Sequence, residues 1–364
     1  MISKRALKFQ SSGIRKMFDL GAHLKNPINF SIGQPDFGPT EDVKNKIIEA
    51  IKKNFYSYTT TQGIPELREK ISKKLKKEND INKSSEEIII TPGTSAGIFL
   101  ALSSIIDPLD EVIIPDPYFV EYPTLIEFLD GKAVFLDTYP TFQIIMENLE
   151  KLVTKKTKVI IINSPNNPTG SIYPENSLRE ITRIAKKYNL IIISDEIYEK
   201  FIYDGQKHFS IGSIYPNTIT LNGLSKSGGI PGWRLGWATG PKEIIEKMKE
   251  IQQYTFVCAP SIIQYGALAA FEAVEISNHV KDYQARRDLI YSLLSGKFKT
   301  VKPQGAFYIM VEVGDGDKFS KWALQNNVLL VPGNVFSQKN SHIRISYATN
   351  VENIRKGADI LTRY

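Results

Sequence analysis

Short apolar runs alternate with stretches of helical period through the middle of the chain. The apolar runs are rich in β-branched residues and lie at 86–90, 110–114, 133–136, 158–162, 190–194 and 218–222. Residues 96–106 are apolar nearly all round, which is typical of a buried helix. Residues 177–188 form one apolar helical face, made of Leu178, Ile181, Ile184, Ala185 and Tyr188. Strands that alternate with helices predict βαβ units and a mostly parallel sheet with helices on both faces.

The pattern becomes mixed after residue 254. Residues 305–313, 327–333 and 342–348 have strand character and indicate a smaller α+β unit. The first 35 or so residues have no strong period, and we expect them to pack on that unit.

Nearly every predicted strand of the middle region runs into a polar or glycine-rich segment. These segments are residues 91–97, 115–119, 163–170, 195–198 and 223–229. Ligands of open α/β sheets bind beyond the carboxyl ends of the strands. We therefore expect these segments to converge on one crevice.

Length and composition narrow the class of protein. A chain of 364 residues is long enough for two domains, and its 42% hydrophobic content is that of an ordinary globular protein. The net charge of +7 is dispersed and gives little support for nucleic-acid binding. The lysine-rich segment 73–79 is interpreted as the solvated face of a helix. No signal-like or membrane-spanning run occurs, so we expect a cytoplasmic protein without a membrane partner.

Cysteine and histidine exclude two kinds of site. The single cysteine, Cys258, rules out an intrachain disulfide framework and a cysteine-based zinc cluster. The histidines lack the spacing of metal ligands, and they are His23, His208, His279 and His342. We expect no metal.

Two basic residues near the last strand of the middle region could carry chemistry. Lys226 follows that strand among small residues, where a desolvated amine could form an imine with an aldehyde. Taken alone, it is more simply a surface loop lysine. Arg234 suits a clamp on phosphate or carboxylate, and stacking on Trp233 or Trp237 is an equal alternative.

The segment TPGTSAG, residues 91–97, lies between a strand and a helix. The backbone N–H groups of Thr94, Ser95 and Ala96 would form an anion site at the helix N-terminus, although simple capping is the alternative. The segment also matches G-x-S-x-G, the nucleophile elbow of serine hydrolases. Asp195 and His342 follow Ser95 in the order that a hydrolase would need.

Four further residues complete the candidate set. Asp195 ends a strand and could keep a heterocyclic nitrogen protonated, with Tyr198 donating to a ring oxygen, although an N-cap with a packed tyrosine is the simpler alternative. Asn167 lies in the turn NSPNNPTG, whose prolines, with either trans or cis bonds, fix an irregular turn and hold it toward the crevice. Arg344 could clamp a carboxylate, while an exposed strand arginine is the default interpretation.

These pieces, in this order, resemble the fold-type I pyridoxal phosphate (PLP) enzymes, most closely the class I/II aminotransferases of the aspartate aminotransferase family. The resemblance covers nearly the whole chain and rests on residues 31–37, 58–69, 91–97, 115–122, 163–170, 194–198, 225–237 and 342–348. It implies a large domain of residues 36–274 with a mostly parallel seven-stranded sheet between helices. A smaller α+β domain would comprise residues 1–35 and 275–364.

The resemblance also implies a role for each candidate. Lys226 would hold PLP as an internal aldimine and later move the proton between the substrate α-carbon and the cofactor. Asp195 would keep the pyridine nitrogen protonated, and Tyr198 and Asn167 would bind the phenolic oxygen. The remaining positions divide into a ring-stacking residue, Phe119; phosphate ligands, Thr94, Ser95, Ala96 and Arg234; and ligands of the substrate carboxylate, Gly33, Asn167 and Arg344.

Two features and the choice of reaction complete this interpretation. Tyr58 matches a tyrosine that reaches the phosphate of the neighbouring subunit, which implies a homodimer. Gly223 departs from the family, where a serine often binds the phosphate, and Ser225 is a nearby substitute. The expected activity is transfer of an amino group from an L-amino acid to a 2-oxo acid by a ping-pong aldimine/ketimine mechanism. A PLP-dependent C–S β-lyase or decarboxylase, and a serine hydrolase that uses Ser95, are the alternatives.

Overall fold

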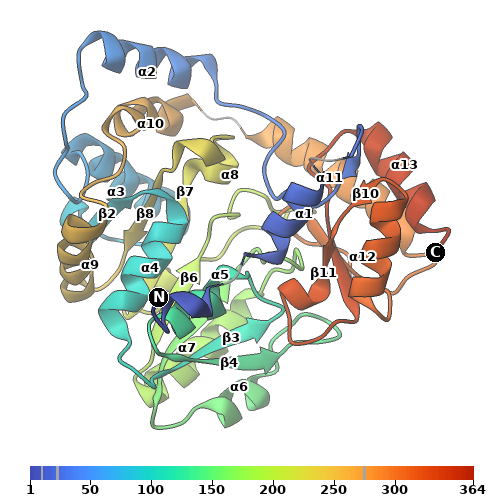
Figure 1. Ribbon diagram of the computed structural model, residues 1–364. Coiled ribbons are helices and arrows are strands. Elements are labelled where there is room, and N and C mark those ends of the chain that lie inside the picture. Colours follow the sequence, from blue (N-terminus) through green and yellow to red (C-terminus); the bar gives the residue numbers. More distant parts are fainter. Residues whose placement is uncertain (10, 22–23, 274–275) are drawn as a thin grey trace.

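A seven-stranded sheet forms the centre of the computed structural model, which describes residues 1–9, 11–21, 24–273 and 276–364 (Figure 1). The strand order is β2-β8-β7-β6-β5-β3-β4, and only β8 is antiparallel to its neighbours. The strands are β2 (Ile88–Thr91), β3 (Glu111–Asp116), β4 (Lys132–Asp137), β5 (Thr157–Asn163), β6 (Ile191–Asp195), β7 (Thr218–Gly223) and β8 (Gly236–Thr239). The predicted mostly parallel seven-stranded sheet is confirmed.

Strand β8 is the one that the apolar pattern did not reveal. It has four residues, Gly-Trp-Ala-Thr, without the β-branched run that marks the other strands. Its pairing with β2 and β7 buries it completely. Tertiary packing rather than local preference therefore makes this segment a strand.

Helices cover both faces of the sheet. One face packs against α4 (Gly93–Ile105), α5 (Glu121–Phe128) and α9 (Lys242–Thr255). The other packs against α6 (Met146–Leu152) and α7 (Glu175–Tyr188), and beside β2 and β8 against α3 (Pro65–Asn79) and α10 (Ser261–Ala273). Helix α2 (Glu41–Lys52) lies on α10, and short turns of 3-10 helix fall at Ser85–Glu87, Ile211–Ser213 and Pro231–Trp233.

Two helical faces differ from their prediction. In α7 the predicted apolar residues are buried except Tyr188, which is 38% exposed at the end of the helix. In α3 the interpretation of residues 73–79 as a solvated face is wrong for Lys74 and Asn79, which are buried with Leu75. Both polar side chains are buried because each has a partner on another element.

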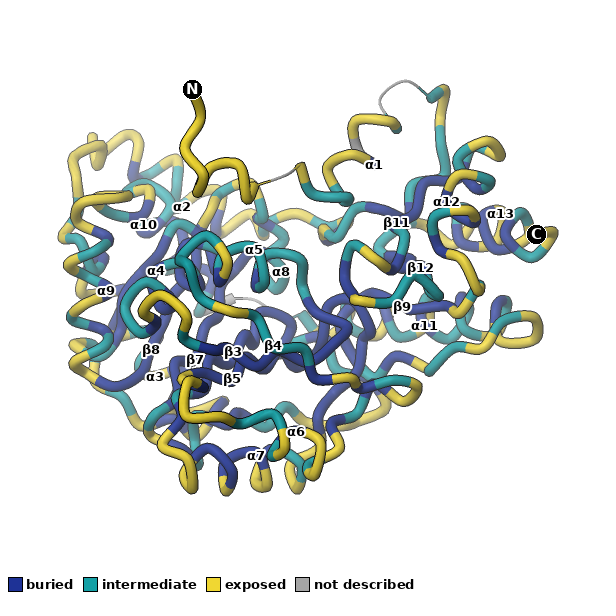
Figure 2. Tube along the Cα trace, turned by 60° about the horizontal axis from the view of Figure 1, so that its bottom comes forward, coloured by how far each residue is buried: buried dark blue, intermediate teal, exposed yellow. Residues whose placement is uncertain are grey.

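The C-terminal part of the chain forms a second, smaller body around a three-stranded antiparallel sheet, ordered β11-β12-β9. Its strands are β9 (Tyr308–Glu312), β11 (Val331–Pro332) and β12 (His342–Ser346), and β10 (Val328–Leu329) pairs separately with β1 (Ile28–Asn29). Its helices are α11 (Ser277–Leu294), α12 (Gly316–Gln325), α13 (Val351–Leu361) and, from the N-terminal segment, α1 (Gly13–Gly21), with a 3-10 turn at Gly333–Val335. In Figure 2 the buried residues gather along the strands of both sheets.

The N-terminal segment divides between the two bodies. Strand β1 joins β10, as expected for packing on the smaller unit. The turn Ala6–Lys8 lies instead beside α5, where Arg5 and Lys8 form ion pairs with Asp130. His23 and the expected domain boundary between residues 274 and 275 lie outside the described residues. In the described ranges, no helix is both long and apolar enough to cross a membrane.

Candidate active site

A cavity of about 220 Å³ lies beyond the carboxyl ends of β5, β6 and β7, beside the N-terminus of α4. Ten of the twelve candidate residues line it: Gly33, Thr94, Ser95, Phe119, Asn167, Asp195, Tyr198, Lys226, Arg234 and Arg344. Ala96 does not line the cavity and is buried in the first turn of α4. Tyr58 is also absent from the lining and is 83% exposed. The crevice expected from the polar segments after the strands is therefore present.

Lys226 lies in α8 (Leu224–Ser227), a single helical turn that directly follows β7. Its ammonium group donates to the carbonyl oxygen of Gly33 at 2.6 Å. Burial lowers the pKa of Lys226 to about 8, and the positive charges of Arg344 and Arg234 act in the same direction. A substantial fraction of this amine is neutral, and therefore nucleophilic, near pH 8.

Asp195 is the last residue of β6, and its carboxylate is buried at the floor of the cavity. Tyr122 donates to its Oδ2 at 2.8 Å, and the backbone N–H of Ile197 donates to its Oδ1 at 3.2 Å. Burial raises the pKa of Asp195 to about 6, although these two hydrogen bonds favour the charged form. The strand end thus holds one carboxylate ready for a positively charged partner.

An anion cradle forms where α4 begins. Gly93 has a φ of +80°, and a Cβ atom there would lie 2.4 Å from Nη2 of Arg234. Only glycine lets the guanidinium group approach the helix N-terminus so closely. The hydroxyl of Thr94 is buried beside them without a hydrogen-bond partner. Two donors and a helix N-terminus that face one space suit a phosphate.

Ser95 does not have the surroundings of a hydrolase nucleophile. Its hydroxyl donates to Oε2 of Glu121 at 2.9 Å. His342 lies on β12, where Nδ1 bonds the hydroxyl of Ser341 and the ring lies 5.0 Å from that of Tyr139. Serine, acid and histidine are not brought together, so the geometry gives the hydrolase alternative no support.

Arg344 on β12 is 1% exposed, so the default interpretation as an exposed strand arginine is wrong. Its Nη1 donates to Oδ1 of Asn167 at 3.1 Å, and Nη2 donates to the carbonyl oxygen of Ser31 at 2.5 Å. The guanidinium group lies between the rings of Tyr308 and Phe336. Its Nε is buried without a partner. A buried, held guanidinium with a free donor suits a carboxylate ligand.

Several residues that sequence reasoning did not single out also line the cavity, and three of them are Glu121, Tyr122 and Tyr308. Tyr122 bonds Asp195, and Glu121 bonds Ser95; both lie in α5, directly after the expected ring-stacking position Phe119. Tyr308 on β9 bonds Tyr198 through their hydroxyls at 2.7 Å. The sequence could have indicated Tyr122, because it lies three residues after Phe119. It could not have indicated Tyr308, which has the pattern of an ordinary aromatic residue in a strand.

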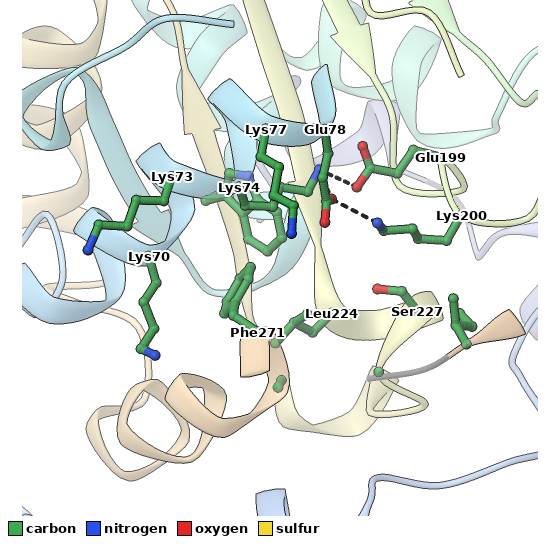
Figure 3. A pocket seen from close by; sticks show the side chains of 14 residues that line it. Lys70, Lys73, Lys74, Lys77, Glu78, Glu199, Lys200, Leu224, Ser227 and Phe271 are labelled. Carbon is green, nitrogen blue, oxygen red and sulfur yellow. Dashed lines mark hydrogen bonds and ion pairs between the residues drawn. The ribbon is translucent and has the colours of Figure 1, made fainter. Parts of the chain in front are cut away.

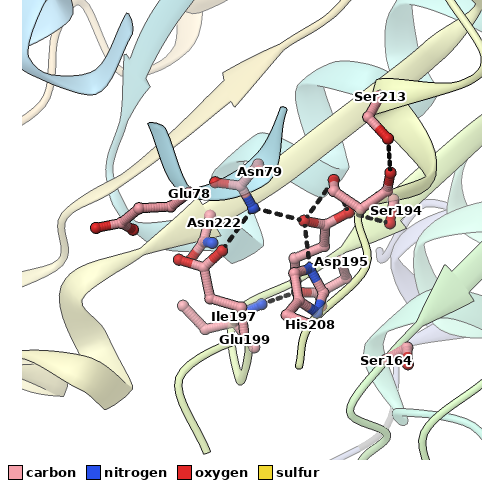
Figure 4. A network of polar contacts seen from close by, with 12 residues as sticks. Glu78, Asn79, Ser164, Ser194, Asp195, Ile197, Glu199, His208, Ser213 and Asn222 are labelled. Atoms are coloured by element: carbon pink, nitrogen blue, oxygen red, sulfur yellow. Dashed lines mark hydrogen bonds and ion pairs between the residues drawn. The ribbon is translucent and has the colours of Figure 1, made fainter. Parts of the chain in front are cut away.

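A second polar cluster lies directly behind Asp195 (Figure 4). Glu196 accepts from the hydroxyls of Ser194 and Ser210 and pairs with Nε2 of His208 at 2.8 Å. Glu199 accepts hydrogen bonds from the buried ammonium of Lys74 and from the amide of Asn79. We call these seven residues the rear network.

The rear network places three groups close enough to ligate a metal, Glu196, Glu199 and His208, whose ligand atoms lie within 4.8 Å of one another. The spacing of these residues along the chain gave no sign of this. The ammonium of Lys74 already neutralises Glu199 at this point, so the cluster needs no cation.

Comparison with known proteins gives one consistent result. Residues 25–361 match the family model for aminotransferase class I and II. A probable aspartate aminotransferase of Methanocaldococcus jannaschii is 42% identical over 99% of both chains, and aromatic-amino-acid aminotransferase 2 of Thermococcus litoralis is 39% identical over 98% of this chain and 96% of its own. The structure of aspartate aminotransferase from Thermus thermophilus with maleate superposes with a TM-score of 0.96 at 34% identity, over 100% of this chain and 99% of that one. The chain therefore belongs to the aminotransferase class I and II family, as its sequence motifs predicted, and it is an aminotransferase.

Proposed function

We propose that the chain binds PLP and moves the amino group of an L-amino acid to a 2-oxo acid in two half-reactions. Its family is PLP-dependent. The observation that carries the proposal is the amine of Lys226, with its lowered pKa, in one cavity with Asp195, an anion cradle and the buried Arg344. When bound, PLP supplies an aldehyde that reacts with amines and a protonated ring that accepts electrons from the substrate α-carbon.

The polar atoms of the cavity fit this cofactor. The unpartnered hydroxyl of Thr94, the guanidinium of Arg234 and the N-terminus of α4 would hold the phosphate. Asp195 would pair with the ring nitrogen, Tyr198 and Asn167 would bind the phenolic oxygen, and Phe119 would stack on the ring. The unpartnered hydroxyl supports this assignment. Buried polar groups normally have hydrogen-bond partners, and a bound phosphate would supply one.

The glycine at position 223 has a structural reason. A Cβ atom there would lie 2.8 Å from the carbonyl oxygen of Leu235 and 3.2 Å from Oγ1 of Thr94. The hydroxyl of Thr94 therefore lies beside the space that a serine side chain at 223 would enter. We propose that Thr94 makes the phosphate contact that the serine makes in other family members, with Ser225, which also lines the cavity, as a second donor.

The chain's own groups would then perform three tasks. Arg344 and Gly33 bind the substrate carboxylate and so fix the orientation of the α-carbon. Lys226 would remove and return the proton at that carbon, because a substantial fraction of its amine is neutral near pH 8. Asp195 stays charged beside a protonated ring nitrogen, because the opposite charge counters its burial.

A neighbouring cavity of about 510 Å³ supports a proposal for the substrate side chain. It shares five lining residues with the first cavity, so the two are adjacent: Ile14, Gly33, Ser95, Phe119 and Glu121. Its lining combines apolar residues, among them Ile14, Ile32 and Leu125, with Arg15, which forms an ion pair with Asp19 at 3.4 Å. Apolar walls suit an aromatic ring and a guanidinium suits a distal carboxylate, and two similar proteins are named for aromatic amino acids and for aspartate.

We also propose the domain division 36–274 against 1–35 with 275–364, and a homodimer in which Tyr58 reaches the neighbouring phosphate. The two separate sheets support the division. The exposure of Tyr58, together with that of Tyr56 and Tyr254, supports the dimer, because a second subunit would bury these aromatic side chains.

The function is tested by incubating the PLP-loaded protein with aromatic and dicarboxylic L-amino acids and 2-oxoglutarate. We expect glutamate and the matching 2-oxo acid to form, with parallel double-reciprocal plots. Borohydride should fix the cofactor to the peptide that contains Lys226. Release of pyruvate and ammonia from a thio-amino acid, without transamination, would instead support a lyase.

A further inference from the structure

A separate cavity of about 540 Å³ lies between α3, the end of α10 and α8 (Figure 3). We propose that it binds an amphipathic anion, meaning a phosphate or another compact anionic group joined to an aromatic or aliphatic body. Neither the family assignment nor the proposed reaction uses this cavity.

Among the described residues that line the cavity, positively charged side chains outnumber negatively charged ones. Five lysines line it against two glutamates, and these residues are Lys70, Lys73, Lys74, Lys77, Lys200, Glu78 and Glu199. The four lysines of α3 recur at the spacing of one helical face. Lys74 pairs with Glu199, and Lys200 pairs with Glu78, so both glutamates are already neutralised.

Two of these lysines have no acidic partner within the described ranges. Lys73 and Lys77 are exposed and form no ion pair there, and Figure 3 shows their side chains extending from α3 at the cavity. Two uncompensated ammonium groups beside one concave surface attract an anion more strongly than a flat, fully solvated face does.

The floor of the cavity is apolar. Leu224, Ala270 and Phe271 line it with Trp237, whose ring centroid lies 5.6 Å from that of Phe271. Trp237 is 2% exposed, and its indole N–H is buried without a hydrogen-bond partner. An inorganic anion would use only the lysines, whereas a ligand with an anionic group and an apolar body would use both the lysines and the floor.

The cavity shares an element with the candidate active site. Leu224 and Ser227 of α8 line it together with Gly228, while Lys226 of the same turn lines the active-site cavity. A ligand here would therefore contact the residues on either side of Lys226. That connection rests on the proposed function, whereas binding itself does not.

Calorimetric titration of the PLP-loaded protein at fixed ionic strength tests the proposal, with phenyl phosphate, inorganic phosphate and phenol as separate probes. Filling the anion cradle with PLP first removes the competing phosphate site. We expect phenyl phosphate to bind at one site per chain, about tenfold more tightly than either fragment. No binding of phenyl phosphate, or equal binding of inorganic phosphate, would overturn the proposal.

A pair of variants on one helix separates a site from general attraction. Lys77→Ala should weaken phenyl phosphate about tenfold. Lys76→Ala removes the same charge from a neighbouring exposed lysine that does not line the cavity, so it should change the affinity less than about twofold. Equal weakening by both changes would mean that only the net charge matters. Unchanged melting temperatures would show that both variants fold.

Discussion

The segment from Ser194 to Glu199 presents two sets of buried polar groups on its opposite sides. Toward the active-site cavity it presents Asp195 and Tyr198. Toward the rear network it presents Ser194, Glu196 and Glu199. Both sets are buried to a similar degree, yet the groups around them differ in how completely their hydrogen bonds are made.

The rear network is closed, and the cavity is not. Both glutamates of the rear network accept several donors, and the charges of Lys74 and His208, against the effect of burial, lower the pKa of Glu199 to about 2. Around the cavity, Thr94 Oγ1 and Arg344 Nε lack partners, and the pKa of Asp195 is raised. A closed network stabilises the fold by itself, whereas an open one is arranged for a ligand. The two sides of one six-residue segment therefore face a closed network and an open cavity.

Removal of the Lys226 amine should have the largest effect on turnover. Lys226→Ala should lower turnover by at least about a thousandfold, because both the imine-forming group and the proton carrier are lost. Steady-state assays with the preferred amino acid measure this loss, and circular dichroism should show an intact fold. Lys226→Arg keeps the charge but cannot lose its proton, so it should be as inactive as the alanine variant. Normal turnover in either variant would refute the role of Lys226.

Breaking the rear network should instead reduce stability. Lys74→Ala leaves Glu199 buried without its cation and should cost about 3–5 kcal/mol in denaturant unfolding. Activity per folded molecule should stay near that of the unmodified protein. The double variant Lys74→Met/Glu199→Leu restores neutrality and should recover most of the stability. A stable but inactive Lys74→Ala protein would erase the distinction between the two sides.

Loss of the buried guanidinium should affect binding. Arg344→Ala should raise the KM of every amino-acid substrate, at a cost of about 2–5 kcal/mol in kcat/KM. Arg344→Lys keeps the charge without the two-pronged geometry and should recover only part of this loss. An effect confined to substrates with one kind of side chain would place Arg344 at the side-chain pocket rather than at the common carboxylate.

Acid should remove the part of the fold's stability that the rear network contributes through Glu199. The pKa of Glu199 is lowered to about 2 from an ordinary 4.5, so its stabilisation is complete above pH 4.5 and is lost as pH falls toward 2. This contribution is of the order of 3 kcal/mol. Unfolding titrations between pH 3 and 6 should show a shallower pH dependence in Glu199→Gln. The same pH dependence of unfolding in Glu199→Gln and in the unmodified protein would contradict the stabilising role of the Glu199 charge.

The smallest expected effect concerns Glu121 at the edge of the anion cradle. Burial raises its pKa, and the negative charge of Asp195 adds to this, while Ser95 and Arg234 oppose it. As pH rises, Glu121 gains a charge close to the proposed phosphate site, so PLP affinity should fall. Glu121→Gln should bind PLP about fivefold more tightly at high pH, with a flatter pH profile. Absorbance titration of the cofactor-free protein with PLP measures the affinity and its pH profile. Weaker PLP binding by Glu121→Gln would refute the expected effect of the Glu121 charge.

The sequence predicted the parallel strands and the convergence of their carboxyl ends, because apolar runs and turn residues are local signals. It did not predict that Lys74 and Asn79 are buried, because the partner of each side chain lies more than a hundred residues away. Arg344 was ambiguous for the same reason: alternation in a strand gives the face of a side chain but not what covers that face. Tyr308 belongs to the smaller sheet, and no local pattern connects it with Tyr198.

The hydroxyl contact between Tyr198 and Tyr308 joins the loop after β6 to the smaller sheet that carries Arg344. Tyr308 also packs its ring on the Arg344 guanidinium and approaches the carbonyl oxygen of Gly33. A rigid displacement of the smaller sheet would therefore move two groups together. They are Arg344, which would bind the substrate, and Tyr308, the hydrogen-bond partner of Tyr198. If the two bodies closed around a substrate, the same movement would also reposition Tyr198 in the cavity.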